Sequence, residues 1–334
     1  MAHLRPRDTP RIFSMGLIAL DILRVADQPE RATFRAGGTA GNVAAILSSL
    51  GWPAQAAGPA DESMASSLML EDLQRCGVEY HALDGACVPV IVEELDVGAQ
   101  HRFLFDCPVC GRELPSYRRN KFATRVGRQT GAYPVPVDVF FADRLSDEIL
   151  ALASAARSQG AFVVYEPSDP ADEPWAGAMF ALAGMVKYSD ERASALPWLK
   201  AGDYLEVRTS GAQGLQWRWP GRAVGRWRSM ESIHASRVVD TCGAGDWLTA
   251  GILVGLLEQL ECSRDQASPS MLDEVLRSAQ RLAAWSTGYA GARGALYESG
   301  PTVARAIMHR GVGQVEPDPF GGSTAAITCL VCPA

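Results

Sequence analysis

Short apolar segments that favour strands alternate with segments that favour helices along most of this chain. Strand-like runs occupy residues 11–20, ending near Asp21, and residues 137–143, 161–167 and 204–209, while residues 42–50 and 145–160 have helical patterns. This alternation is typical of a parallel sheet that is covered by helices on both faces. The predicted fold is therefore α/β, with a central, mainly parallel sheet flanked by helices.

Polar residues follow several of the predicted strands. Ligands of open α/β sheets bind beyond the carboxyl ends of the strands, and Asp21, Asp143, Glu166 and Thr209 fall at such ends. Residues 88–106 break the alternation, because two β-rich halves flank a turn at residues 96–98. That pattern predicts a hairpin, which could form a lid.

Size and charge exclude some classes of protein. The 334 residues are 47% apolar, enough for the core of one large domain, and the net charge of -7 argues against general nucleic-acid affinity. No apolar run reaches the length of a membrane span, which predicts no membrane partner. Residues 1–11 lack the apolar segment of a secretory signal. We therefore expect a flexible leader and a cytoplasmic protein.

The segment VDTCGAGDW, residues 239–247, combines glycines with two carboxylates just before an apolar helical run. Glycine lets backbone N–H groups approach a ligand closely, and a helix N-terminus attracts anions. Asp246 would lie in the first turn of that helix, where a carboxylate can take a proton from an attacking hydroxyl. Taken alone, the segment is equally compatible with a capped buried helix.

Four motifs together resemble the ribokinase-like, PfkB-type carbohydrate kinase family. DTCGAGD resembles its signature before the anion-hole helix, and GGTAGNVAAILSSLG, TSGAQG and GARGAL resemble three further motifs in the family's order. The matches span about residue 16 to about residue 295. The resemblance implies the α/β fold predicted above with a small β lid. It also implies transfer of the ATP γ-phosphoryl group to a hydroxymethyl oxygen, with magnesium.

The resemblance also implies roles for individual residues. Asp246 would be the base, and the backbone of Gly243, Ala244 and Gly245 would hold the transferring phosphate. Substrate hydroxyls would be bound by Asp21, Gly38, Asn42 and Asp143. The nucleotide and its ions would lie near Lys187, Ser189, Thr209, Gly211, Gly214 and Asp240, with Asp240 at a monovalent-cation (K+) position.

The chain departs from the family pattern where magnesium is usually ordered. The family's N-x-x-E segment reads SDER here, with Ser189 and Arg192 at the two places and Glu191 one residue away. Glu166, at a neighbouring strand end, could help order the ion. Trp247 and Leu248 also replace a small residue and a phenylalanine after the base. The chain is therefore identified as a divergent member, whose substrate the sequence does not name.

Two C-x-x-C pairs have no counterpart in these motifs. Cys107 and Cys110 have the look of a zinc knuckle, and Cys329 and Cys332 could complete a site of four thiolates. Separate free cysteines and a redox pair are the alternatives. A basic stretch follows the first pair and consists of Arg112, Arg118, Arg119, Lys121, Arg125 and Arg128. We interpret it first as a solvent-exposed face of the protein. The second interpretation is a binding site for an extra phosphate on the substrate or for nucleic acid.

The predicted organisation is a leader over 1–11, a kinase domain over 12–320 and a tail over 321–334. The lid would comprise about 17–36 and 86–106, and a Cys/Arg-rich insertion about 107–130. The predicted function is an ATP-dependent sugar or nucleoside kinase. The alternative is a non-catalytic ligand-binding or regulatory protein on a kinase scaffold, associated with nucleic acid through the knuckle and basic stretch. A homodimer through the lid stays open.

Overall fold

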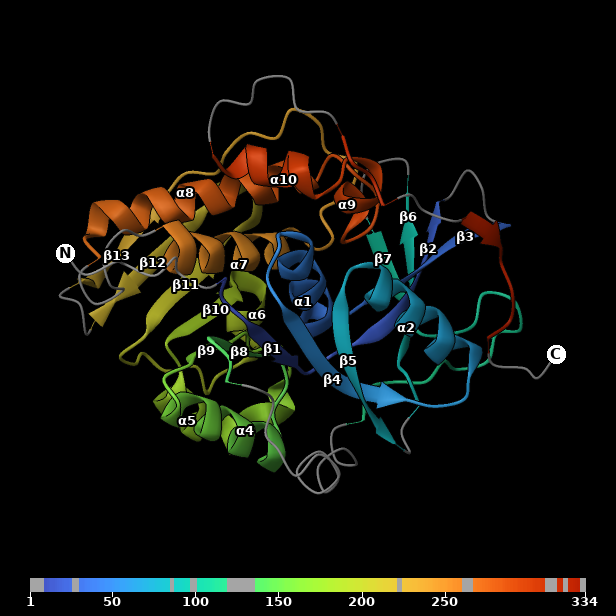
Figure 1. Cartoon of the computed structure of the whole chain (residues 1–334), viewed down its shortest axis with the longest axis horizontal. Helices are drawn as coiled ribbons and strands as arrows, with labels where there is room; N and C mark the ends of the chain where they lie inside the picture. The colour runs from blue at the N-terminus through green and yellow to red at the C-terminus, as the bar shows by residue number, and fades with distance from the viewer. Residues whose placement is uncertain are drawn as a thin grey trace, which may run out of the picture.

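The computed structural model describes residues 9–25, 30–84, 87–96, 101–118, 136–220, 224–259, 267–309, 317–320 and 324–330, which form a nine-stranded and a five-stranded sheet. Figure 1 shows the large sheet with its helices beside the small sheet. None of the described helices is long and apolar enough to cross a membrane.

The large sheet has the strand order β13-β12-β11-β10-β9-β8-β1-β4-β5. The strands from β11 to β5 are parallel, and β12 and β13 extend one edge in antiparallel fashion. The central, mainly parallel sheet is as predicted. Its strands are β1 Ile12–Met15, β4 Ala54–Ala60, β5 Val78–Asp84, β8 Val139–Ala142, β9 Phe162–Tyr165, β10 Met185–Ser189, β11 Leu205–Thr209, β12 Leu215–Trp219 and β13 Val224–Met230.

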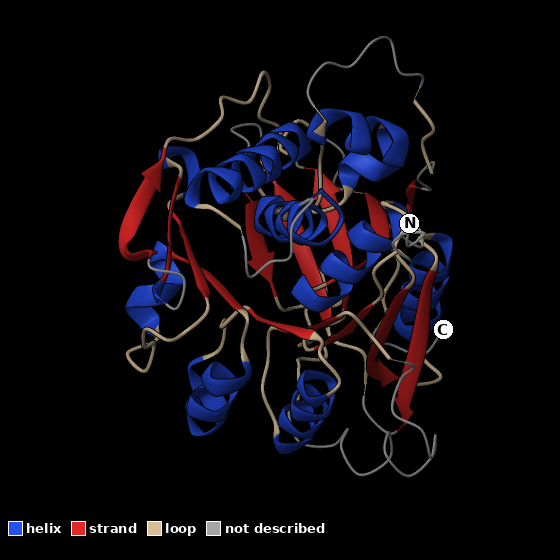
Figure 2. Ribbon diagram, turned by 60° about the vertical axis from the view of Figure 1, so that its left-hand side comes forward, coloured by secondary structure: helices blue, strands red, loops and turns tan. Residues whose placement is uncertain are grey.

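Helices cover both faces of this sheet, as Figure 2 shows. On the central strands, alternate side chains enter two different cores: Ile12, Val139 and Val164 pack in one, and Phe13 and Phe140 in the other. Because both faces are buried, these strands are apolar at nearly every position. The helices are α1 Thr39–Ser49, α2 Met64–Arg75, α4 Asp147–Ser158, α5 Glu173–Leu182, α6 Asp190–Ala195, α7 Ala244–Val254, α8 Pro269–Ser286, α9 Gly294–Glu298 and α10 Pro301–Met308.

The small sheet has the order β14-β3-β2-β6-β7, in which only β2 and β6 pair in parallel. Four of its strands fall within the ranges assigned to a lid, and β6 and β7 form the antiparallel pair expected there. Its closing over a substrate stays a prediction. The strands are β2 Ala19–Val25, β3 Arg31–Gly37, β6 Val90–Leu95, β7 His101–Leu104 and β14 Thr324–Ala326.

The prediction of one strand over residues 11–20 was wrong. The segment forms β1 in the large sheet and β2 in the small sheet, with a break at Gly16, whose φ is 137°. A Cβ at Gly16 would lie 1.8 Å from an oxygen of Asp143, so glycine lets the chain cross between the sheets. Asp21 consequently lies inside β2, opposite Arg35 and Ile91, and not at a strand end.

The start of α2 follows Asp61, a residue type that often caps helices, but Asp61 is not the cap here. Ser63 is the N-cap, and its hydroxyl accepts a hydrogen bond from the Ser66 N–H. Asp61 instead accepts hydrogen bonds from the backbone and side chain of Ser63. Asp61 therefore holds the cap residue, and it does not cap the helix itself because it lies two residues before the N-cap position.

Candidate active site

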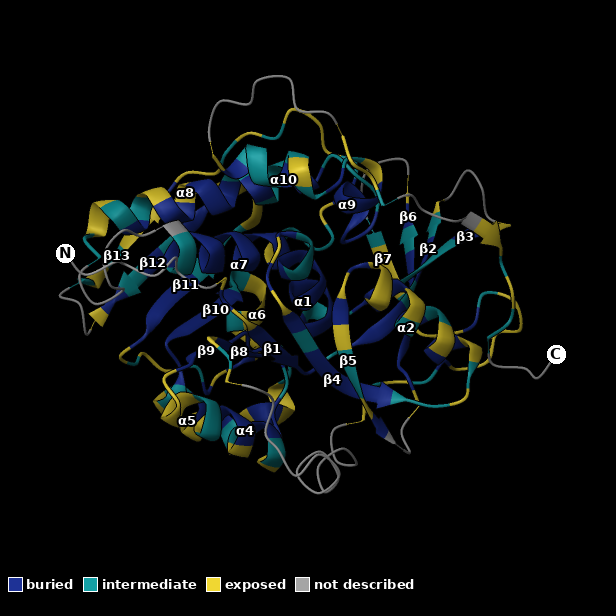
Figure 3. Cartoon of the chain, viewed as in Figure 1, coloured by how far each residue is buried: buried dark blue, intermediate teal, exposed yellow. Residues whose placement is uncertain are grey.

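Helix α7 begins at the glycine-rich segment and runs through the protein core. Every residue from Asp246 to Val254 is buried (Figure 3), and the helix packs between α1 and α8. Gly243 is its N-cap with a φ of 73°, and a Cβ there would lie 2.5 Å from the backbone of Ala292. Glycine is therefore required at position 243 for two reasons: its backbone conformation and the close approach of the 290–294 loop.

The N-terminus of α7 faces a positive side chain. A Cβ at Gly245 would lie 3.5 Å from Nζ of Lys187, so the ammonium group comes close to the first turn. Within that turn the Ala244 N–H donates to the Thr241 carbonyl at 3.3 Å, and the Trp247 N–H to the Gly243 carbonyl at 3.0 Å. The helix dipole and Lys187 together make this region favourable for an anion.

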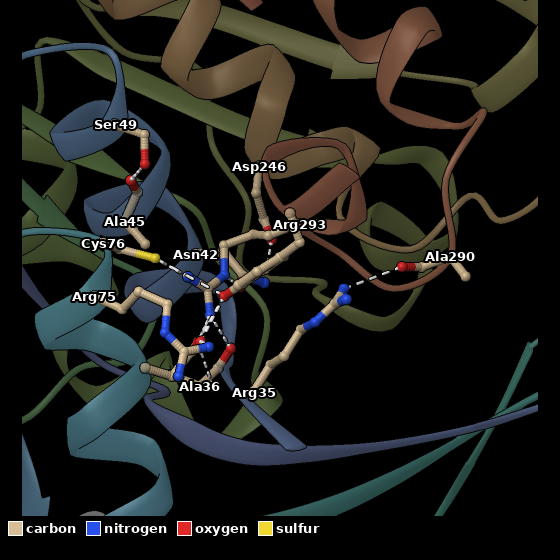
Figure 4. Close-up of polar contacts among 12 residues, drawn as sticks. Arg35, Ala36, Asn42, Ala45, Ser49, Arg75, Cys76, Asp246, Ala290 and Arg293 are labelled. Carbon is tan, nitrogen blue, oxygen red and sulfur yellow. Dashed lines mark hydrogen bonds and ion pairs between the residues drawn. The ribbon is translucent and has the colours of Figure 1, made fainter. Parts of the chain in front are cut away.

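Asp246 lies in the first turn of α7, and only 8% of its surface is exposed. The Asn42 Nδ2 group donates a hydrogen bond of 2.8 Å to Oδ2 of Asp246, and Arg293 Nε donates one of 3.1 Å to Oδ1 of Asn42. Figure 4 shows the three side chains converging from α1, α7 and the loop before α9. Asn42 is thus held in one amide orientation, with its NH2 group directed at the carboxylate.

The environment raises the pKa of Asp246 from 3.8 to about 7. Burial is the largest cause, and the charge of Glu166 adds to it, while Lys187 and the Asn42 hydrogen bond act in the opposite direction. A carboxylate with a pKa near neutrality can both accept and release a proton at physiological pH. This is the property that a general base needs.

A buried ion pair lies beside the helix start. Nζ of Lys187, on β10, is 2.8 Å from Oε2 of Glu166, which follows β9, and both side chains are about 5% exposed. The Thr249 hydroxyl on α7 donates to Glu166 and also to the Gly245 carbonyl. The ion pair therefore connects two central strands to α7. Glu166 was expected to help order magnesium, and in this structure its carboxylate already has two protein partners.

Arg293 is a buried centre of hydrogen bonding that the sequence reasoning did not identify. Its guanidinium group, 1% exposed, donates to Asp72 at 2.6 Å, to the Ala36 carbonyl and to the Cys76 sulfur at 3.0 Å. The Tyr297 hydroxyl donates to the same Asp72 carboxylate. A single charged residue within the glycine-rich GARGAL motif was the available signal, although nothing local indicated its partners.

A pocket lies next to Arg293, between the small sheet and the 290–293 loop, and its polar lining includes Asp21, Arg35, Asn42 and Glu93. Burial raises the pKa of Asp21 to about 7, partly offset by the charge of Arg293. Asp21 and Asn42, both predicted to bind substrate, thus line one pocket, and Asn42 also contacts Asp246. Arg35 and Glu93 were not predicted.

Gly38 and Asp143, the other two predicted substrate residues, meet at the chain crossing between the sheets. The Leu17 N–H donates to Oδ1 of Asp143 at 2.8 Å, and Arg144 pairs with Oδ2 at 2.8 Å. Gly38 has a φ of 75°, and a Cβ added at this position would lie 2.3 Å from the Leu17 carbonyl oxygen. In this structure both oxygens of Asp143 have protein partners, which is the pattern of an anchor for the crossing.

The residues predicted to border the nucleotide lie together at one end of β10 and β11. Ser189 and Thr209 are paired neighbours on these strands. Ser189 caps α6 by accepting the Arg192 N–H, and Asp190 accepts hydrogen bonds from Arg208 and Ser210. The turn that follows contains Gly211, which has open space around it, and Gly214, which lies against the backbone of residues 230–232.

Asp240, predicted at a monovalent-cation position, is completely buried. It accepts hydrogen bonds from the N–H groups of Cys242 at 2.8 Å and Gly291 at 2.7 Å, and Nδ1 of His101 lies 3.3 Å from it. Glu93, His101 and Asp240 are close enough together to hold a metal ion. Burial and the charge of Asp240 raise the pKa of Glu93 to about 8, so protonated Glu93 is favoured at neutral pH.

Comparison with known proteins gives a family match over part of the chain. Residues 137–298, which include α7 and the ion pair, match the family described as pfkB family carbohydrate kinase. None of the curated protein sequences is significantly similar to the chain.

Solved structures share the fold at low identity. Aminoimidazole riboside kinase from Salmonella enterica, in complex with aminoimidazole riboside and an ATP analog, has a TM-score of 0.64 at 17% identity, covering 89% of this chain and 99% of that one. Adenosine kinase from Sinorhizobium meliloti has a TM-score of 0.64 at 18% identity with the same coverage. A fructokinase double mutant from Vibrio cholerae O395, with fructose, ADP and potassium ion, has a TM-score of 0.62 at 18% identity, covering 87% and 96%.

Proposed function

Because residues 137–298 form a pfkB family carbohydrate kinase domain on a ribokinase-like fold, we propose that this protein is an ATP-dependent kinase of a sugar or nucleoside. The γ-phosphoryl group of ATP would pass to a hydroxymethyl oxygen of the substrate. The bond between the γ-phosphorus and its bridging oxygen breaks, and ADP leaves with that oxygen. The solved kinase from S. enterica and the fructokinase from V. cholerae support these substrate classes through their ligands.

The observation that carries the proposal is the position of Asp246. Its carboxylate is buried in the first turn of α7, is oriented by Asn42 and has a pKa of about 7. It would take the proton of the attacking hydroxyl as that oxygen bonds to phosphorus. The amides of Gly243, Ala244 and Gly245, with Lys187 beside them, would stabilise the negative charge of the transferring group.

The substrate would bind where Asp21 and Asn42 meet, at a pocket that in this structure has room for about one water molecule and would have to widen to admit a sugar. An ionised carboxylate accepts hydrogen bonds and an amide both donates and accepts, so the two suit a pair of neighbouring hydroxyls. We propose that Gly38 and Asp143 contribute mainly by holding the chain crossing at the edge of this pocket, since both engage Leu17. The nucleotide would lie along the 209–214 turn, next to Ser189.

Magnesium would neutralise charge on the nucleotide phosphates. Glu166 is a buried carboxylate at this place, but Lys187 and Thr249 engage its two oxygens, so it would have to release one of them to hold the ion. The positive charges of Lys187 and Arg192 partly offset the raised pKa of Asp246, so both act on the site. Arg192 belongs to the segment where the family usually has an acid. A potassium ion near Asp240 is proposed on the resemblance and on the fructokinase alone.

The test is release of ADP from ATP in the presence of a panel of sugars and nucleosides, measured with a coupled assay. We expect turnover with at least one substrate, a kcat/KM that rises with pH with its midpoint at about 7, and no measurable transfer by Asp246→Asn. Binding of a non-hydrolysable ATP analogue, measured by calorimetry, should be retained by that variant. Transfer at the wild-type rate by Asp246→Asn would remove Asp246 as the base.

The second candidate is a ligand-binding protein without catalysis. It is favoured by the segment in which Ser189 caps α6 and Arg192 stands where an acid is expected. Tight binding of both a nucleoside or sugar and ATP, without ADP release by the wild-type protein, would support this candidate instead.

A further inference from the structure

Three cysteines from distant parts of the chain meet on the side of the molecule that carries the small sheet. Sγ of Cys329 lies 3.7 Å from Sγ of Cys107 and 3.5 Å from Sγ of Cys110, and the three sulfurs form a group able to hold a metal ion. None of the three is in a disulfide. Their separation is that of neighbouring ligands around one ion: in a tetrahedron with Zn–S bonds of about 2.3 Å, two sulfurs are about 3.8 Å apart.

The backbone around Cys107 is folded as a tight knuckle. The Gly111 N–H donates to the Cys107 carbonyl at 2.8 Å, the Cys107 N–H donates to the Arg112 carbonyl at 2.7 Å, and Gly111 has a φ of 71°. The turn keeps the Cys110 sulfur within 4.8 Å of the Cys107 sulfur. A packing role for Cys107 alone would not need this arrangement.

The third cysteine is brought in by strand pairing. β14 pairs with β3, and the Ile327 N–H then donates to the Glu30 carbonyl at 3.0 Å. The tail, red in Figure 1, continues past this point, and Ile327, Cys329 and Leu330 pack against the main core. Cys107 is itself 3% exposed within that core. The convergence is therefore supported by backbone pairing and by apolar packing on both sides.

We propose that Cys107, Cys110 and Cys329 hold a structural zinc ion that fastens the two edges of the small sheet. The sheet order makes β7 one edge and β14 the other. Cys107 follows the end of β7 by three residues, and Cys329 follows the end of β14 by three residues. Each thiol loses its proton to solvent on binding. Cys332, the fourth ligand predicted from the sequence, lies outside the described residues.

The zinc content of the whole protein tests this proposal. Protein purified under reductant, without chelator, is expected to carry about one zinc per chain by elemental analysis, with a shell of three or four sulfurs at about 2.3 Å by X-ray absorption. Cys107→Ser and Cys329→Ser should lose this zinc, whereas Cys87→Ser, a control at an exposed cysteine, should keep it.

Wild-type protein also gives a test that needs no variant to fold. Removal of zinc by a chelator under reductant should lower the Tm and speed hydrogen exchange in β7 and β14, with the exchange of α7 unchanged. Re-addition of zinc should reverse both effects. The proposal is overturned by reduced wild-type protein that binds no zinc, by a shell of light atoms only, by iron as the bound metal, or by a disulfide between Cys107 and Cys329 in the protein as purified.

Discussion

Replacing Asp246 by asparagine should stabilise the protein while removing its proposed base. Burial of the carboxylate raises its pKa from 3.8 to about 7, so ionisation in the folded protein is unfavourable. At about 1.4 kcal/mol for each pH unit, the cost is at most about 4 kcal/mol above pH 7. Asparagine has nearly the same shape, carries no charge and can still accept the hydrogen bond from Asn42.

The sign follows from proton linkage. A carboxyl group with a raised pKa contributes stability that is fully present below pH 3.8 and is lost as the pH rises through about 7. Asp246→Asn does not titrate and escapes that loss. Its advantage over wild type in free energy of unfolding should therefore grow by roughly 2 to 3 kcal/mol between pH 5 and pH 8.

The assay is urea unfolding of both proteins at pH 5, 6, 7 and 8, followed by circular dichroism. Asp190→Asn is a control whose difference from wild type should stay constant over this range, because hydrogen bonding from Ser210 lowers the pKa of Asp190 below 3.8 and its stabilisation is fully present from pH 5 to pH 8. If wild type and Asp246→Asn have parallel stabilities across this range, the carboxylate is not buried and repelled as described. Asp246 would then also lack the raised pKa that suits it to act as the base.

Two further predictions concern the surroundings of the helix start. Lys187→Met leaves Glu166 buried without its ion pair and should lower the free energy of unfolding by about 3 to 5 kcal/mol, measured by urea unfolding. Adding Glu166→Gln should recover most of this loss. A double variant as unstable as the single variant would contradict the prediction. Gly243→Ala should destabilise the protein far more than Gly160→Ala. Both glycines have a positive φ, but only at Gly243 would the added Cβ lie 2.5 Å from another backbone, that of Ala292. Equal melting temperatures of the two variants would count against the close packing of the 290–294 loop.

Local patterns were sufficient for the framework and for the helix mouth. Continuous apolar strands between helical segments can be buried only in a sheet covered on both sides, so the parallel sheet was predictable. The run after Asp246 is apolar all round and therefore had to be an internal helix, and Gly243 supplies the positive φ of 73° that the turn requires. These features depend on neighbours within a few residues.

The break at Gly16 was not predicted, because it depends on residues that are distant in the sequence. A glycine between two apolar runs does not reveal whether the chain continues in one sheet or crosses to another. The crossing depends on Asp143, which accepts the Leu17 N–H from a distance of 126 residues in sequence. Asp21 was therefore assigned to the wrong kind of position, although it does line the pocket.

What the sequence by itself determined was the α/β framework, the glycine turn and the acid beside it. Only the tertiary structure decided the state of that acid, because Asn42 is 204 residues from Asp246 and Arg293 is 251 residues from Asn42. The same holds for Cys107, Cys110 and Cys329, which come together only once β14 joins the small sheet. Hydrogen bonds and charges act over a few ångströms in space, and residues distant in sequence come within that range only through the packing of the whole fold.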